Sequence, residues 1–174
     1  MPLEELLEAN KAFVQGREAR ALQHLPARRL VVLTCMDCRL SGFLAEALGL
    51  RPGDAVVLRN AGARLTQDVL RSLVVAVYAQ SVNEIAVVGH RDCGMARLSV
   101  GELTTAMSKA GVSREALPNE DLASWLGVCA NPEQSVREAV ATIRASQVLP
   151  KGLVVYGLLL DEVTGELTVI ERAA

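Results

Sequence analysis

Residues 30–39 read LVVLTCMDCR and give the strongest indication of the fold. Its first five residues are apolar or uncharged, which is typical of a strand buried on both faces of a parallel sheet. Residues 85–94 read IAVVGHRDCG and show the same pattern, in which an apolar run is followed by a potential metal ligand. Ligands bind beyond the carboxyl ends of the strands in open α/β sheets. We therefore expect Cys35, His90 and Cys93 to meet in one crevice.

Further strands and helices extend this pattern along the chain. Besides the strands at 30–34 and 85–89, strands are predicted at 55–58, 153–160 and 167–170, and the short connection before the last one predicts an antiparallel hairpin. Helices are predicted at 3–14, at 41–49, from Thr66 or Asp68 through 77, and from 131 to about 147. The segment 17–29 reads as a loop, and 94–130 contains broken helical pieces.

The strand–helix alternation predicts the α/β class. We expect one domain over residues 1–174, with an N-terminal helix and loop at 1–29 and an α/β core at 30–172. Its central sheet has four to five mostly parallel strands flanked by helices, and a short antiparallel strand forms the C-terminal edge.

Composition excludes several classes of protein. The chain has 174 residues and a net charge of −2, which argues against a nucleic-acid partner. The longest apolar run is too short to cross a membrane, and the acidic start Met1–Glu5 does not resemble a secretory signal. We therefore expect a cytoplasmic protein, in which four cysteines indicate metal binding or catalysis rather than disulfides.

Two thiolates and one imidazole match a catalytic zinc site, which has three protein ligands and one open position. Asp37 follows Cys35 by two residues and has two mutually exclusive roles. It can accept a hydrogen bond from the reacting water, or it can ligate zinc itself and close the site. Arg39, through a bidentate ion pair with Asp37, would decide between them.

Other interpretations of these cysteines remain open. Cys35 and Cys38 form a C-x-x-C, which could be a thiol redox pair or half of a structural zinc site. The redox interpretation leaves His90 and Cys93 without a role, and a four-thiolate site would need a second C-x-x-C, which the sequence lacks. A zinc-stabilised binding module without catalysis is a further alternative.

The combination of Cys35-x-Asp37-x-Arg39 with His90-x-x-Cys93-Gly94 resembles the signature of the β-class carbonic anhydrases. Residues 59–62, RNAG, and the closing pattern from Val155-Tyr156-Gly157 through Gly165-Glu166-Leu167 are also similar to that family. The resemblance covers residues 28–172 and is to the short form of the family.

The resemblance implies zinc-dependent, reversible hydration of carbon dioxide to bicarbonate by metal-bound hydroxide. It implies one zinc per chain, held by Cys35, His90 and Cys93, with Asp37 as a fourth ligand only in a closed form. Asp37 and Arg39 would be the catalytic dyad, and Gly62 would lie near the substrate. It also implies a homodimer or dimer of dimers, with the N-terminal helix packed across the interface. The same fold hosts hydrolysis of carbon disulfide or carbonyl sulfide, which is the nearest alternative.

Several other residues near these motifs have simpler expected roles. We expect Arg59 to be a structural arginine paired with a carboxylate, and Arg91 and Asp92 to be solvated loop charges. Cys129 and Trp125 are expected in the core or in an interface.

Overall fold

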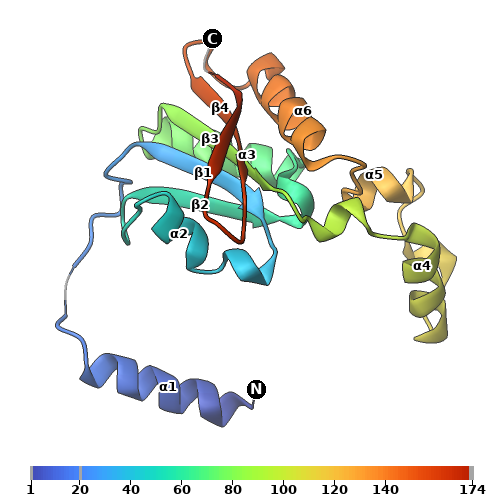
Figure 1. Cartoon of the computed structure of the whole chain (residues 1–174), viewed down its shortest axis with the longest axis horizontal. Coiled ribbons are helices and arrows are strands. Elements are labelled where there is room, and N and C mark those ends of the chain that lie inside the picture. Colours follow the sequence, from blue (N-terminus) through green and yellow to red (C-terminus); the bar gives the residue numbers. More distant parts are fainter. Residues whose placement is uncertain (1, 20, 173–174) are drawn as a thin grey trace.

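A five-stranded sheet forms the centre of the molecule (Figure 1), as the computed structural model describes for residues 2–19 and 21–172. The strand order is β2-β1-β3-β4-β5. All neighbours are parallel except β4 and β5, which form an antiparallel pair. The predicted architecture is thus confirmed. The strands are β1 (Leu30–Cys35), β2 (Ala55–Asn60), β3 (Glu84–His90), β4 (Val154–Leu160) and β5 (Leu167–Glu171).

Helices cover both faces of this sheet, and alternate strand residues face opposite ways. On one face, Val31 and Leu33 of β1 pack with α3 (Gln67–Ala79) and α6 (Pro132–Ala145). On the other face, Val32 lies in a second cluster with Leu44 of α2 (Phe43–Ala47). Because both faces are buried, the strands carry the continuous apolar runs seen in the sequence.

The helix starts follow local capping chemistry. The Thr66 side chain accepts the Val69 N–H and starts α3, and Asn131 accepts the Glu133 N–H ahead of Pro132 in α6. The expected start at Ser41 is wrong. α2 begins only after Gly42, whose φ is 85°, and the Ser41 hydroxyl instead accepts a hydrogen bond from Arg59.

The strands that carry the candidate ligands are longer than expected. We predicted ends at Thr34 and Gly89, but β1 continues through Cys35 and β3 through His90. The register places Cys35 opposite Asn60 of β2, and His90 opposite Leu160 of β4. The candidate ligands Cys35 and His90 are therefore fixed by strand pairing and not by loop conformation alone.

Two parts of the chain extend away from the sheet (Figure 1). The helix α1 (Leu3–Gln15) stands apart from the core and buries no residue. The region 94–130, expected to be broken helix, consists of short helices and 3-10 turns. These are Gly94–Ala96, α4 (Val100–Lys109), Arg114–Ala116 and α5 (Leu122–Leu126). Among the described residues, no helix has the length and apolar character needed to cross a membrane.

Candidate metal centre

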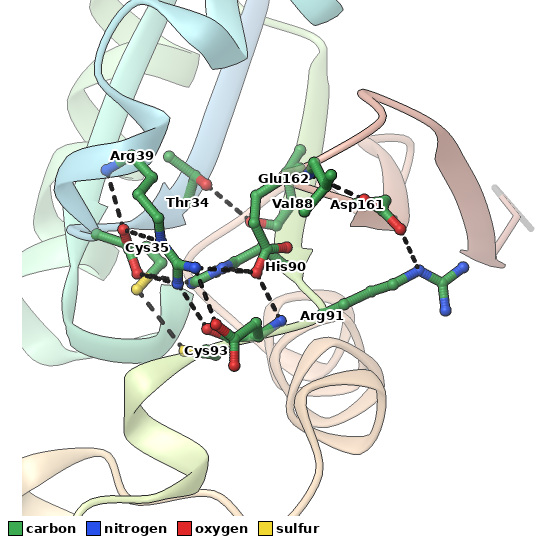
Figure 2. A network of polar contacts seen from close by, with 12 residues as sticks. Thr34, Cys35, Arg39, Val88, His90, Arg91, Cys93, Asp161 and Glu162 are labelled. Carbon is green, nitrogen blue, oxygen red and sulfur yellow. Dashed lines mark hydrogen bonds and ion pairs between the residues drawn. The ribbon is translucent and has the colours of Figure 1, made fainter.

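The three predicted ligands converge at the carboxyl ends of β1 and β3 (Figure 2). Cys35 is the last residue of β1, His90 the last of β3, and Cys93 lies in the loop that follows. One ligand atom from each lies within 4.8 Å of the other two, and the two sulfur atoms are 3.8 Å apart. All three side chains are buried. The convergence expected from the strand ends is present.

The state of these buried groups fits a bound cation. Both ring nitrogens of His90 are buried without a hydrogen-bond partner in the described part of the chain. The Cys93 thiol beside Cys35 lowers the pKa of Cys35, and the same contact, together with burial, raises the pKa of Cys93. A divalent cation would stabilise both thiolates and occupy the imidazole lone pair, so the donor set suits zinc.

Asp37 is held by Arg39 at the edge of this group. Arg39 Nε donates to Asp37 Oδ1 at 3.0 Å and Nη2 donates to Oδ2 at 2.8 Å, which is a bidentate pair. This pairing lowers the pKa of Asp37 well below the usual range for a carboxyl group. Asp37 Oδ2 lies 3.9 Å from His90 Nε2 and outside the close three-residue group. The carboxylate therefore faces the metal centre while Arg39 holds it.

Asp92 is more than the solvated loop charge that the sequence predicts. Its carboxylate accepts a hydrogen bond from Arg39 Nη1 at 2.9 Å and also pairs with Arg97, while its backbone oxygen accepts one from Arg39 Nη2 at 2.7 Å. These two cations lower the pKa of Asp92. The expectation for Arg91 is also incomplete, because this residue donates to the Thr168 hydroxyl at 3.1 Å. Asp92 thus fixes the far side of the guanidinium that holds Asp37.

Arg59 has a structural role, but the prediction that it pairs with a carboxylate is wrong. Its guanidinium donates to the backbone oxygens of Cys35 at 3.1 Å and Asp37 at 2.7 Å. Arg59 lies at the end of β2, next to the strand that carries Cys35. Arg59 therefore holds the chain between the candidate ligand Cys35 and Asp37, because carbonyl oxygens at the end of a strand need donors.

A cavity of about 10 Å³ lies against the three ligands. Gly62 lines it, as do two residues that the sequence did not assign to the site, Cys129 and Ser135. Cys129 is buried as expected, whereas Trp125 is half exposed. The Ser135 hydroxyl is buried without a partner among the described residues. The cavity is about large enough for one water molecule.

Comparison with known proteins decides the family. A family model described as carbonic anhydrase matches residues 30–167, most of the chain. The crystal structure of β-carbonic anhydrase isoform I from Trichomonas vaginalis superposes with a TM-score of 0.93 at 32% identity, covering 100% of both chains. The chain belongs to the β-class carbonic anhydrase family.

Other members of the family are similar over nearly the same length. The carbonic anhydrase of Streptococcus mutans has a TM-score of 0.85 at 34% identity, and the match covers 98% of this chain and 99% of that one. A carbon disulfide hydrolase of Acidianus sp. is 30% identical over 94% of this chain and 88% of its own. The β-carbonic anhydrases are zinc proteins, and Cys35, His90 and Cys93 are positioned here to bind that metal.

The redox interpretation of Cys35 and Cys38 loses support in this β-carbonic anhydrase. Cys35 is buried against Cys93, whereas Cys38 is exposed. The sequence also missed Glu162, whose carboxylate lies 3.6 Å from His90 Nδ1 (Figure 2). Glu162 follows the end of β4, so the rule that identified Cys35 and His90 would have found it too.

Proposed function

We propose that this chain catalyses the reversible hydration of carbon dioxide to bicarbonate. The observation that carries the proposal is the buried group of Cys35, His90 and Cys93 with the held carboxylate of Asp37 beside it. Zinc, when bound, would supply a Lewis acid that makes water a nucleophile at neutral pH. Cys35, His90 and Cys93 would hold it, and the protein has to orient the reacting water and exclude others.

Asp37 and Arg39 perform the orienting step. Asp37 accepts a hydrogen bond from the reacting water, so that an oxygen lone pair is directed toward the carbon of the substrate. Arg39 keeps that carboxylate ionised and turned toward the centre through its two hydrogen bonds. Arg39 donates also to Asp92, so the dyad is anchored outside the site. In the alternative role, Asp37 would leave Arg39 and would serve as a fourth ligand when zinc is bound, which would close the site.

Gly62 borders the place where substrate would bind. It lines the small cavity at the ligands, and its φ of 78° lies in the region that favours glycine. A Cβ at this position would lie 3.2 Å from the backbone oxygen of Gly127 and 3.5 Å from Met95. Glycine therefore keeps a side chain out of the wall beside the proposed ligands.

Hydrolysis of carbon disulfide is a second candidate function. A relative of 30% identity carries the name carbon disulfide hydrolase, and so does a solved structure with a TM-score of 0.72 at 29% identity. Carbon disulfide is a linear heterocumulene like carbon dioxide, so the same ligands and dyad could act on it. Carbonyl sulfide belongs to the same class.

We also infer that the chain acts as a homodimer, alone or in a dimer of dimers. The helix α1 exposes Leu3, Leu6, Leu7, Phe13 and Val14, and a helix of 13 residues is marginal without packing. Beside the free edge of β2 lies an apolar cleft of about 320 Å³, lined by Leu40, Leu44, Leu50 and Val57 among others. The α1 helix of a second copy is the proposed occupant of this cleft.

A cytoplasmic location is part of the proposal. All four cysteines are free thiols, and two of them serve as proposed ligands. Thiols persist in reducing compartments. Cell fractionation with an antibody to the chain tests this point, and recovery in a secreted or membrane fraction would contradict it.

Stopped-flow assays on samples of known zinc content test the function. We expect about one zinc per chain and fast hydration of carbon dioxide. Zinc-loaded protein that hydrolyses carbon disulfide but does not hydrate carbon dioxide would replace the first proposal with the second. Metal-free protein that reduces disulfides through Cys35 and Cys38 would overturn both.

A further inference from the structure

Glu162 is a buried carboxylate that the proposed mechanism does not use. Its side chain is 4% exposed, and its Oε2 atom has no hydrogen-bond partner in the described part of the chain. Its Oε1 atom accepts the Asp92 N–H at 2.9 Å and lies 3.5 Å from Arg39 Nη1. Burying a carboxylate is costly unless it is paired. A carboxylate this deeply buried therefore calls for donors beyond the Asp92 N–H and Arg39.

The proposed ligand His90 is a candidate for such a donor, and it faces the Oε1 atom of Glu162. Its Nδ1 lies 3.6 Å from Glu162 Oε1, and its Nε2 lies on the opposite side of the ring, 3.9 Å from Asp37. Neither ring nitrogen has a hydrogen-bond partner among the residues that the structure describes. An imidazole that binds metal through one nitrogen carries its proton on the other, and that N–H needs an acceptor.

Strand geometry places the two residues together. β3 and β4 are paired in register up to His90 and Leu160, and Glu162 follows two residues beyond that pair. Glu162 lies in the turn that joins β4 to the antiparallel strand β5, and its side chain points toward the carboxyl end of β3 (Figure 2). The proposed partner of the imidazole thus comes from the turn that follows β4, a different part of the chain from the ligands.

We propose that Glu162 is a positioning residue for the metal centre. It accepts the Nδ1–H of His90, which fixes the tautomer that presents Nε2 to the metal, and it supports Arg39 from the same oxygen. This inference rests on the proposed metal centre and adds a residue to it. A move of a few tenths of an ångström by either side chain brings the 3.6 Å contact to hydrogen-bond length.

This arrangement accounts for two of the buried polar atoms that lack partners. The described residues contain four such side-chain atoms: both His90 ring nitrogens, Glu162 Oε2 and Ser135 Oγ. A cation on Nε2 and a hydrogen bond from Nδ1 to the Glu162 carboxylate satisfy both nitrogens. A purely structural Glu162 would need only the Asp92 N–H and Arg39, and it would leave the imidazole unexplained.

Zinc affinity, measured by competition with a chromophoric chelator, tests the proposal without an activity assay. We expect Glu162→Leu to weaken zinc binding by about 10–100-fold. Glu162→Gln keeps an acceptor oxygen but no charge, so its loss should be smaller. Glu166→Gln is the matched control, because it removes an exposed carboxylate from the same turn. It should bind zinc like the wild type.

The imidazole itself provides a second readout. The chain has two histidines, so protein labelled with ¹⁵N at histidine gives two sets of ring signals. In the zinc-loaded wild type we expect His90 to carry its proton on Nδ1, with a downfield proton resonance that moves upfield in Glu162→Gln. This shift remains decisive if Glu162→Leu does not fold.

The outcomes separate the two proposals. Wild-type protein that does not bind zinc would overturn the metal centre itself. Zinc binding and a His90 spectrum unchanged by Glu162→Gln, with Glu162→Leu equally unaffected or unfolded, would overturn the role of Glu162 and leave the metal centre standing.

Discussion

Asp37 is the residue on which the proposed chemistry depends most directly. Asp37→Asn keeps the size of the side chain but weakens it as an acceptor and abolishes the ion pair with Arg39. We expect kcat to fall by about 10–100-fold with zinc content unchanged. Stopped-flow hydration of carbon dioxide measures this loss.

The control for this variant is Asp68→Asn. Asp68 is exposed on α3, and within the described ranges its carboxylate pairs only with Arg71 of the same helix, so its replacement should leave kcat unchanged. Equal activity of Asp37→Asn and wild type would remove Asp37 from the mechanism.

The same ion pair gives a pH-dependent contribution to stability. Arg39 lowers the pKa of Asp37 in the folded protein, so folding favours the ionised carboxylate. The stabilisation is therefore complete above the ordinary carboxyl pKa of about 3.9 and is lost as pH falls through the lower folded pKa. In metal-free protein, the difference in unfolding free energy between wild type and Asp37→Asn should be constant from pH 7 to 5 and shrink in stronger acid. A difference that grows on acidification would contradict this.

At the scale of elements, two strand glycines set the distance between α6 and the sheet. A Cβ on Gly89 would lie 2.6 Å from a methyl group of Val136, and one on Gly157 would lie 2.9 Å from its other methyl. Gly89 directly precedes His90. The close approach of α6 thus determines how tightly the ligand-bearing end of β3 is packed.

Gly89→Ala should therefore destabilise the fold by about 1–3 kcal/mol. In a Val136→Ala background both methyl groups are gone, and the cost should be smaller by about 0.5 kcal/mol or more. Chemical denaturation of the four proteins in this cycle measures both values. Gly101→Ala is the control, because nothing lies within 4 Å of a Cβ there. Additive effects of Gly89→Ala and Val136→Ala would refute the predicted clash.

The elements differ in how well the sequence predicts them. Apolar runs predicted all five strands, because burial on both faces leaves a strong local signal. The start of α2 was missed because the Ser41 hydroxyl binds Arg59, a partner from another strand. The contacts of Arg59 and Asp92 could not be predicted for the same reason, because each is made with a residue distant in sequence. Glu162 was within reach of the strand-end rule but carried no recognised motif.

At the scale of the whole molecule, the proposed dimer assigns a function to the exposed stripe of α1. Leu6→Ser combined with Phe13→Ser removes two exposed apolar side chains from that stripe. Each should weaken dimerisation by about tenfold or more. Sedimentation velocity over a concentration series measures the change. Glu8→Ser, on the polar side of α1, is the control and should not affect association, and a monomeric wild type would contradict the proposal.

Zinc removal is expected to weaken the entire fold. Cys35 and His90 belong to neighbouring strands, and a metal bound to both stabilises the folded chain by about 4 kcal/mol when free zinc is 1,000 times its Kd. Thermal unfolding with and without a chelator measures this. Mg²⁺ should not restore stability, because that cation prefers oxygen ligands. Identical Tm values would contradict zinc binding at this place.

The pairing of β1 with β3 has a consequence for assembly of the protein. The proposed zinc ligands come from segments far apart in the chain. A nascent fragment that stops before β3 therefore lacks two of the three and could not hold zinc. Such topology makes metal uptake a late, all-or-none event that follows closure of a long loop. Zinc loading during synthesis would thus report that the sheet is complete. A zinc-deficient cell would accumulate a chain that is less stable and has no activity.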